Sequence, residues 1–198
     1  MTYIKLTILA FAGLILGGGS ALWMSGLIGM ASPASFADIN INGWASDRSI
    51  GAASADAYTR ARVARHGLLA LAKEEAIYFT RRIDDDGNLL LEGCTYELTG
   101  GPQHAFWWSI TLYDADSRLP MNEDDALSID ATTVGNTGEW TATIAPILPV
   151  SGHWLYSRSA GNFDLTLRLY RPAANVIENP QRALFAPRIR KLSCEDAT

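Results

Sequence analysis

The chain has 198 residues, a formal net charge of −5 and only 19% charged residues. This length suits one domain with a sizeable core behind a hydrophobic N-terminal segment. The mild acidity argues against a nucleic-acid partner, because sequence-independent binding needs a basic face that displaces counterions from phosphates.

The N-terminal segment is the clearest signal in the sequence. No charged residue lies between Leu6 and Ala37, and the apolar part, LTILAFAGLILGGGSALWMSGLIGM, ends at Met30. A helix needs about 20 residues to cross the hydrocarbon core, whereas the apolar region of a signal peptide has about 7–15. We therefore expect residues 1–31 to form an uncleaved transmembrane anchor. The alternative is a signal peptide cleaved after Ala37, where the letters SFA place small residues at the last and third-last positions.

The charge before this span predicts its orientation. Lys5 is the only charged side chain there, so the positive-inside rule places the N-terminus in the cytoplasm. We expect a single-pass protein of the bacterial inner membrane whose C-terminal domain lies in the periplasm, with Trp23 in the outer aromatic belt. Gly13 and Gly17 form a GxxxG pattern, which either pairs this helix with another membrane helix or reflects the high glycine content of membrane spans.

Two cysteines, Cys94 and Cys194, can form a disulfide if the domain lies outside the cytoplasm. Such a bond closes a loop of about 100 residues, and in the chain-entropy model it stabilises the fold by roughly 4–5 kcal/mol. The alternative is a pair of buried free thiols. No CxxC motif and no Cys/His cluster with zinc spacing competes for the two residues, and we expect no metal site.

A polar stretch and a helix precede the strands. Residues 32–50 are small, polar and aperiodic, so we expect a linker there and a single domain over residues 51–198. The stretch SADAYTRARVARHGLLALAKEEA predicts an amphipathic helix that begins at Ser54, its N-cap, with Asp56 in the first turn. Gly67 weakens the middle of this helix or ends a first segment of it.

After Glu75 the apolar period changes to two, which predicts strands. An Asp-Gly turn in DDDG separates the first two candidates. In the third candidate, Phe106 and Trp108 share one face with Ile110 and Leu112, while Trp107 and Tyr113 lie on the other. The candidate strands are AIYFTRRI, NLLLEGCTYEL, AFWWSITLYDA, GEWTATIAPIL and NFDLTLRLYRP.

These elements predict a mainly β fold. One amphipathic helix is followed by strands with short polar turns and no strand–helix–strand alternation, so we expect an antiparallel, jelly-roll-like β-sandwich preceded by a transmembrane helix. The tail, NPQRALFAPRIRKLSC, contains two prolines and four basic residues, and we expect it to run over the surface.

The order of the motifs resembles a bacterial family, domain of unknown function 1214. The similar stretches are ADAYTRARVARHGLLAL, EEAIYF, CTYELTG, FWWSITLYDAD, WLYSRSAGNFDLTLRLYRP and NPQRALFAPRIRKL. The resemblance implies a jelly-roll-like sandwich, an N-terminal membrane anchor in short members, and a protein partner that carries domain of unknown function 1254. The family has no established reaction, so no catalytic residue is carried over. The sequence departs from its relatives at Tyr156 and Ser157.

The chemistry-bearing residues form no catalytic signature. HExxH, GxSxG, GxGxxG and GxxxxGK[ST] are all absent, and we expect no cofactor. The acidic stretch DADSRLPMNEDD fails the EF-hand pattern at Arg118 and Leu119, so we interpret it as a solvated loop rather than a calcium site. The candidate ligand or partner residues are therefore Trp107, Trp154, His104 and Tyr113.

These features favour a membrane-anchored periplasmic binding or accessory protein of the cell envelope over an enzyme. The alternative is an envelope protein that binds or hydrolyses a glycan with carboxylates brought together by the fold. A cleft with two acidic groups about 5–10 Å apart favours the glycan hypothesis, whereas an exposed apolar patch favours a partner protein.

Overall fold

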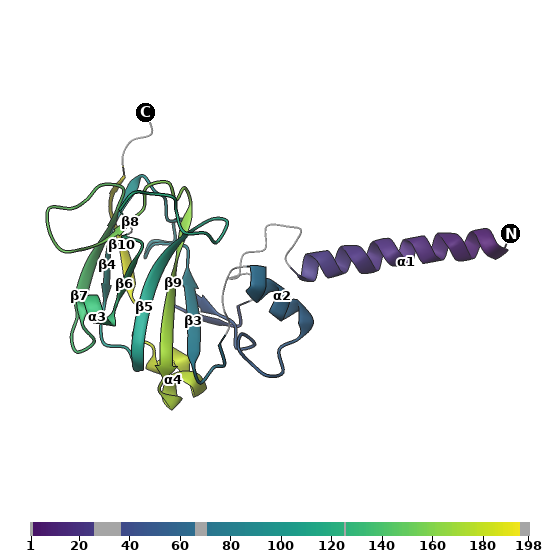
Figure 1. Ribbon diagram of the computed structural model, residues 1–198, viewed down its shortest axis with the longest axis horizontal. Coiled ribbons are helices and arrows are strands. Elements are labelled where there is room, and N and C mark those ends of the chain that lie inside the picture. Colours follow the sequence, from purple (N-terminus) through teal and green to yellow (C-terminus); the bar gives the residue numbers. More distant parts are fainter. Residues whose placement is uncertain (1, 26–36, 66–70, 125, 195–198) are drawn as a thin grey trace.

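The computed structural model describes residues 2–25, 37–65, 71–124 and 126–194. An isolated N-terminal helix precedes a body built from two β-sheets (Figure 1). The helices are α1 (Thr2–Met24), α2 (Ala57–Arg65), α3 (Ala131–Val134), α4 (Ala174–Glu178) and α5 (Pro180–Ala183). The strands are β1 (Ile39–Ile41), β2 (Trp44–Ser46), β3 (Ala76–Arg81), β4 (Cys94–Gly100), β5 (Ala105–Asp114), β6 (Ser128–Asp130), β7 (Trp140–Ala145), β8 (His153–Tyr156), β9 (Phe163–Pro172) and β10 (Arg188–Cys194).

The strands form one larger and one smaller sheet. The larger sheet has six strands in the order β1-β2-β3-β9-β5-β6, and the smaller has four in the order β10-β4-β7-β8. The long strands β5 and β9 pair along nearly their whole length, with Trp108 opposite Leu169 and Leu112 opposite Leu165. The mainly β prediction is confirmed, whereas jelly-roll connectivity stays a prediction.

The core lies between the two sheets and is fixed by the alternation along the strands. Trp108, Ile110 and Leu112 of β5 are fully buried, as the two-residue period predicts. Trp108 of the larger sheet stacks on Trp140 of the smaller, with ring centroids 5.0 Å apart. Phe106 is the exception on its face: it is 73% exposed at the sheet end, with the Arg171 guanidinium 4.7 Å from its ring centroid.

The predicted disulfide is confirmed. Cys94 and Cys194 are bonded and lie directly opposite each other where β4 pairs with β10. The bond ties the end of the chain to an inner strand of the smaller sheet. Disulfides of this kind form and persist in oxidising compartments.

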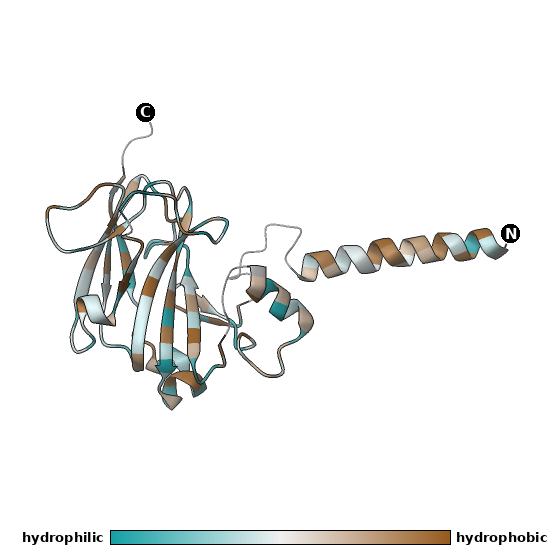
Figure 2. Cartoon of the chain, in the orientation of Figure 1, coloured by the Kyte–Doolittle hydropathy of each residue, from teal (hydrophilic) through white to brown (hydrophobic). Residues whose placement is uncertain are grey.

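The helix α1 is mostly apolar, with a hydrophilic patch near its N-terminal end (Figure 2). Its segment Tyr3–Met24 is long and hydrophobic enough to cross a membrane. A helix with these properties near the N-terminus is either a single-pass anchor or a signal sequence. The predicted anchor continues through residues 26–31, which lie outside the described residues. The alternative cleavage position after Ala37 directly follows that stretch.

Part of the expected linker is instead a β-hairpin. Strands β1 and β2 pair around Asn42 and Gly43, whose φ angles of 51° and 86° are those of a tight hairpin turn. The hairpin joins the larger sheet where Ala45 pairs with Thr80. Trp44 is fully buried, and its Nε1 donates to the Pro187 carbonyl over 2.7 Å. The linker prediction is therefore wrong for residues 39–46, because burial of Trp44 holds this segment on the body.

The predicted helix is shorter than expected. The helix α2 begins at Ala57 because Asp56, rather than Ser54, accepts hydrogen bonds from the amides of Tyr58 and Thr59. These bonds, chiefly that from Thr59, lower the pKa of Asp56. Residues 71–75 form a turn rather than helix, and Gly67 lies outside the described residues.

Three features of the strand arrangement differ from expectation. The strands on either side of the DDDG turn, β3 and β4, belong to different sheets. The tail contributes strand β10, where Ile189 is fully buried, instead of only crossing the surface. Strands β7 and β8 are parallel, with Ala142 opposite His153. The loop from Ala145 to His153 runs back along β7 by three to four residues, which is about 10–13 Å at roughly 3.3 Å per residue, so a short loop can join two parallel strands here.

Candidate functional site

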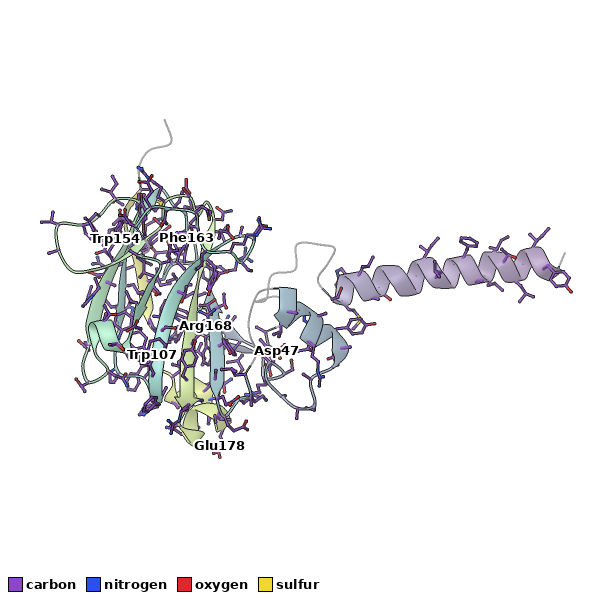
Figure 3. All side chains as sticks on the ribbon, viewed as in Figure 1. Asp47, Trp107, Trp154, Phe163, Arg168 and Glu178 are labelled. Atoms are coloured by element: carbon purple, nitrogen blue, oxygen red, sulfur yellow. A yellow bond between two sulfur atoms is a disulfide. The ribbon has the colours of Figure 1, made fainter. Side chains whose placement is uncertain are left out.

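The four candidate residues do not form one site. Trp107 and Tyr113 lie on the outward side of β5 in the larger sheet, whereas Trp154 lies on β8 in the smaller sheet. Figure 3 shows Trp107 and Trp154 at separate places on the body. His104 is exposed just before β5, where its ring lies 5.6 Å from that of Phe185.

Trp107 and Tyr113 belong to a larger arrangement, which we call the outer face. Its members project outward from the three central strands β3, β9 and β5, and strand pairing places them in rows. Trp107 lies opposite Tyr170, Ser109 and Tyr78 lie on either side of Arg168, and Tyr113 lies opposite Asp164. The outer face consists of Tyr78, Thr80, Trp107, Ser109, Thr111, Tyr113, Asp164, Thr166, Arg168 and Tyr170.

The rings and the guanidinium of the outer face hold one another in place. Trp107 packs against Tyr170 with centroids 5.2 Å apart, and its Nε1 donates to Thr132 Oγ1 over 2.9 Å. Arg168 Nη2 donates to the Tyr113 hydroxyl over 2.7 Å, and its guanidinium lies 5.2 Å from the Tyr113 ring centroid. These contacts on paired strands pre-organise the side chains, which lowers the entropy lost when a ligand binds.

Asp164 is the titratable group with the largest shift on the outer face. Burial raises the pKa of Asp164 to about 7, although the positive charges of Arg82 and Arg168 and a hydrogen bond from Thr166 act in the opposite direction. The Thr166 hydroxyl donates to Asp164 Oδ1 over 3.4 Å. The carboxyl is therefore a proton donor or acceptor near neutral pH, on the same face as the aromatic rings.

Trp154 lies at the base of an exposed apolar region, which we call the β8 loop surface. Its indole contacts Tyr156 at 4.7 Å and donates to the Ala145 carbonyl over 3.1 Å. The loop between β7 and β8 carries Ile147, Leu148 and Val150, which are 60%, 69% and fully exposed. Met121, 92% exposed on the loop between β5 and β6, completes the set. The sequence signal is the apolar run PILPV, whose first three residues belong to the predicted strand GEWTATIAPIL, whereas β7 ends at Ala145.

The acidic stretch after β5 is a turn and an exposed loop. Asp114 Oδ1 accepts from the amides of Asp116 and Arg118, which closes the turn. Across residues 2–25, 37–65, 71–124 and 126–194, no group of three or more His, Cys, Asp or Glu side chains is arranged to hold a metal ion.

The fold and these surfaces define a two-sheet β protein with an apolar N-terminal helix and a disulfide. A family model described as protein of unknown function (DUF1214) matches residues 75–174, and the chain belongs to this family. This confirms the family predicted from the motifs.

A solved structure from Vibrio shares the fold. The VPA0106 protein from Vibrio parahaemolyticus superposes with a TM-score of 0.58 at 19% identity, covering 96% of this chain and 46% of that one. This chain thus spans less than half of the Vibrio protein. An uncharacterized protein from Burkholderia cenocepacia matches at a TM-score of 0.45 and 13% identity, over 60% of this chain and 30% of that one. No curated protein matches the chain.

Proposed function

We propose that the chain is a binding or accessory component of a bacterial envelope complex, held at the inner membrane by α1 with its domain in the periplasm. The outer face carries this proposal. Trp, Tyr and Arg are the residues enriched at the energetic centres of protein interfaces. Here Trp107, Tyr113, Arg168 and Tyr170 are fixed on the paired strands β5 and β9.

The proposed partner is a protein that carries domain of unknown function 1254, as the family resemblance implies, or another envelope component. The Vibrio protein has more than half of its length outside the matched part. A separate partner protein could correspond to the part of the Vibrio protein that this chain does not match, and this is compatible with the proposal.

Two features support the proposed location. The apolar helix α1 supplies a span, and the Cys94–Cys194 disulfide fits an oxidising compartment. The protein should remain with the membrane fraction after a high-salt wash, and its intact mass should include residues 1–37. In spheroplasts, an added protease should digest the domain. Release into the soluble fraction with the N-terminus at Asp38 would instead establish a cleaved signal peptide.

The test of the binding role is affinity purification of the full chain from mild detergent. We expect one envelope protein to co-purify in stoichiometric amount and to be lost from the Trp107→Ala/Arg168→Ala variant. The matched control is Thr141→Ala, an exposed residue on the smaller sheet. Recovery of the wild-type chain alone would contradict the proposal.

A second candidate function is glycan binding or hydrolysis, and the raised pKa of Asp164 favours hydrolysis. A carboxyl that stays protonated near neutral pH can act as a general acid, and neighbouring rings can stack on sugars. Peptidoglycan fragments should then bind the wild-type chain more tightly than Trp107→Ala, and equal affinity would exclude glycan binding on the outer face. Cleavage of the fragments should depend on Asp164, so an Asp164→Asn variant that still cleaves them would exclude hydrolysis by this residue.

A further inference from the structure

We infer that the β8 loop surface docks a protein partner that has an apolar pocket bordered by basic residues. The inference rests on the proposed binding function and adds a second surface to the outer face. It places Ile147, Leu148, Val150 and Met121 in the partner's pocket, with Trp154 at the base of the loop.

The apolar side chains lie in one region because the two loops meet at β8. The Asn122 amide group donates to the carbonyls of Tyr156 and Arg158, and the Tyr156 amide donates to the Ala126 carbonyl over 2.7 Å. The loop that carries Met121 therefore runs beside β8, and the 146–152 loop leads directly into β8. Residues 146–152 contain no charged residue, so these loops present neighbouring apolar side chains to solvent.

The loop between β7 and β8 is suited to act as a rigid projection. Pro146 and Pro149 flank Ile147 and Leu148 and fix two of the backbone φ angles. Trp154 Nε1 holds the base of the loop through the Ala145 carbonyl. A projection ordered before binding loses less conformational entropy when it enters a pocket.

The charges around the loops indicate the chemistry of the partner. Asp116, Glu123 and Asp124 are exposed on the loop that carries Met121. Asp116 lies 3.9 Å from Arg118, whereas no described basic side chain lies within 4 Å of Glu123 or Asp124. Two exposed basic residues, Arg118 on the same loop and Arg158 beside Asn122, offset part of this charge. The region keeps a net negative charge, which complements a basic rim around an apolar pocket and opposes contact with anionic lipid.

The position of the β8 loop surface also favours a protein over the membrane. The chain enters the larger sheet at β1, and β6 lies at the opposite edge of that sheet. Strand β6 contacts β8 of the smaller sheet, so the apolar loops lie on the side away from the tether (Figure 1). This arrangement leaves them free to meet a protein beside the domain.

Photo-crosslinking and affinity measurement together test the inference. A benzoylphenylalanine is introduced at position 148 of the full chain in cells, and at position 106 as a control. Phe106, 73% exposed at the far end of β5, is the matched residue. We expect one envelope protein to crosslink from position 148 and not from position 106. Crosslinks only to lipid, only to a second copy of the chain, or to nothing would overturn the inference.

The crosslinked protein is then purified and titrated against full-length variants in detergent. We expect Leu148→Asp to weaken binding by roughly ten-fold or more, because a buried unpaired charge opposes docking. Phe106→Asp should leave the affinity unchanged, and added salt should weaken wild-type binding. Equal thermal stability of Leu148→Asp and wild type establishes that the variant is folded.

The two variants separate this inference from the proposed function. Equal affinity of wild type and Leu148→Asp would overturn docking at the β8 loop surface. If that partner were still lost from Trp107→Ala/Arg168→Ala, the binding function would stand on the outer face alone.

Discussion

Arg81 is a buried cation whose hydrogen bonds join three segments of the chain. It is 3% exposed, and its guanidinium donates to the carbonyls of Ile83 and Pro187 and to Asp85 Oδ1. Asp85 also accepts from Arg188 and from the Ile189 amide, which lower its pKa although partial burial acts in the opposite direction. The side chain thus links the end of β3 to the start of β10.

We expect Arg81→Met to destabilise the protein by about 3 kcal/mol, because the Ile83 carbonyl loses its donor and the Pro187 carbonyl and Asp85 each lose a charged donor, although Trp44 still donates to Pro187. Urea unfolding of the full chain in detergent measures this change. The control is Arg118→Met, which removes an exposed pair and should cost at most about 0.5 kcal/mol. Similar losses in both variants would show that Arg81 has no special role.

Asp164 couples stability to pH with a sign opposite to that of an ion-paired carboxylate. Its pKa is about 7 in the folded chain, against an ordinary value of 3.8. The folded state therefore binds the proton more tightly than the unfolded state. The stabilisation associated with this group is complete below pH about 3.8, declines as pH rises towards 7, and is absent above that.

Asp164→Asn removes this titration, so the melting temperature should fall less between pH 4 and pH 8 than it does for the wild type. Other carboxyls titrate in the same range, and the difference between the two curves isolates Asp164. Thr141→Ala, an exposed substitution that changes no titratable group, should give a curve parallel to the wild type. A parallel curve for Asp164→Asn would contradict the raised pKa.

At the scale of elements, the sequence predicts features that depend on neighbouring residues, such as the strands, and misses those that depend on pairing between distant segments. The two-residue period predicts β5 and β9, including the outward positions of Trp107, Tyr113, Asp164 and Arg168. That Arg168 contacts Tyr113 depends on the pairing of β5 with β9 across 55 residues, which no period shows. The β1–β2 hairpin is missed because three-residue strands are too short for a period, although its Asn-Gly turn is a hairpin signal.

The hairpin gives a prediction at the same scale. Gly43 and Gly87 both have positive φ, 86° and 88°, but a Cβ at Gly43 would lie 3.0 Å from Arg81 Nε, whereas one at Gly87 meets nothing within 4 Å. Alanine at either position should cost about 1 kcal/mol for its backbone conformation. Gly43→Ala should cost more, because it also displaces Arg81. Equal free energies of unfolding for both variants would show that the Arg81 side chain can move aside without loss of stability.

At the scale of the whole molecule, one disulfide fixes how the C-terminal end of the domain is held. The chain passes through β4, leaves to add half of the larger sheet and two strands of the smaller sheet, and returns to β4 as β10. In sequence the bonded cysteines are 100 residues apart, and the edge strand β10 pairs only with β4. The side chains of β10 beyond Ile189 are exposed and bury little apolar surface, so much of the attachment of this strand depends on pairing and on the covalent link.

We therefore expect the Cys94→Ser/Cys194→Ser variant to fold with a lower free energy of unfolding, by up to about 4–5 kcal/mol in the chain-entropy model. Hydrogen exchange should show that the loss of protection begins at β10, whereas β5 and β9 keep their protection in the folded variant. Wild type treated with reductant should reproduce the variant, and the variant itself should not respond to reductant. Unchanged stability and uniform exchange in the variant would mean that strand pairing alone holds β10 on the sheet.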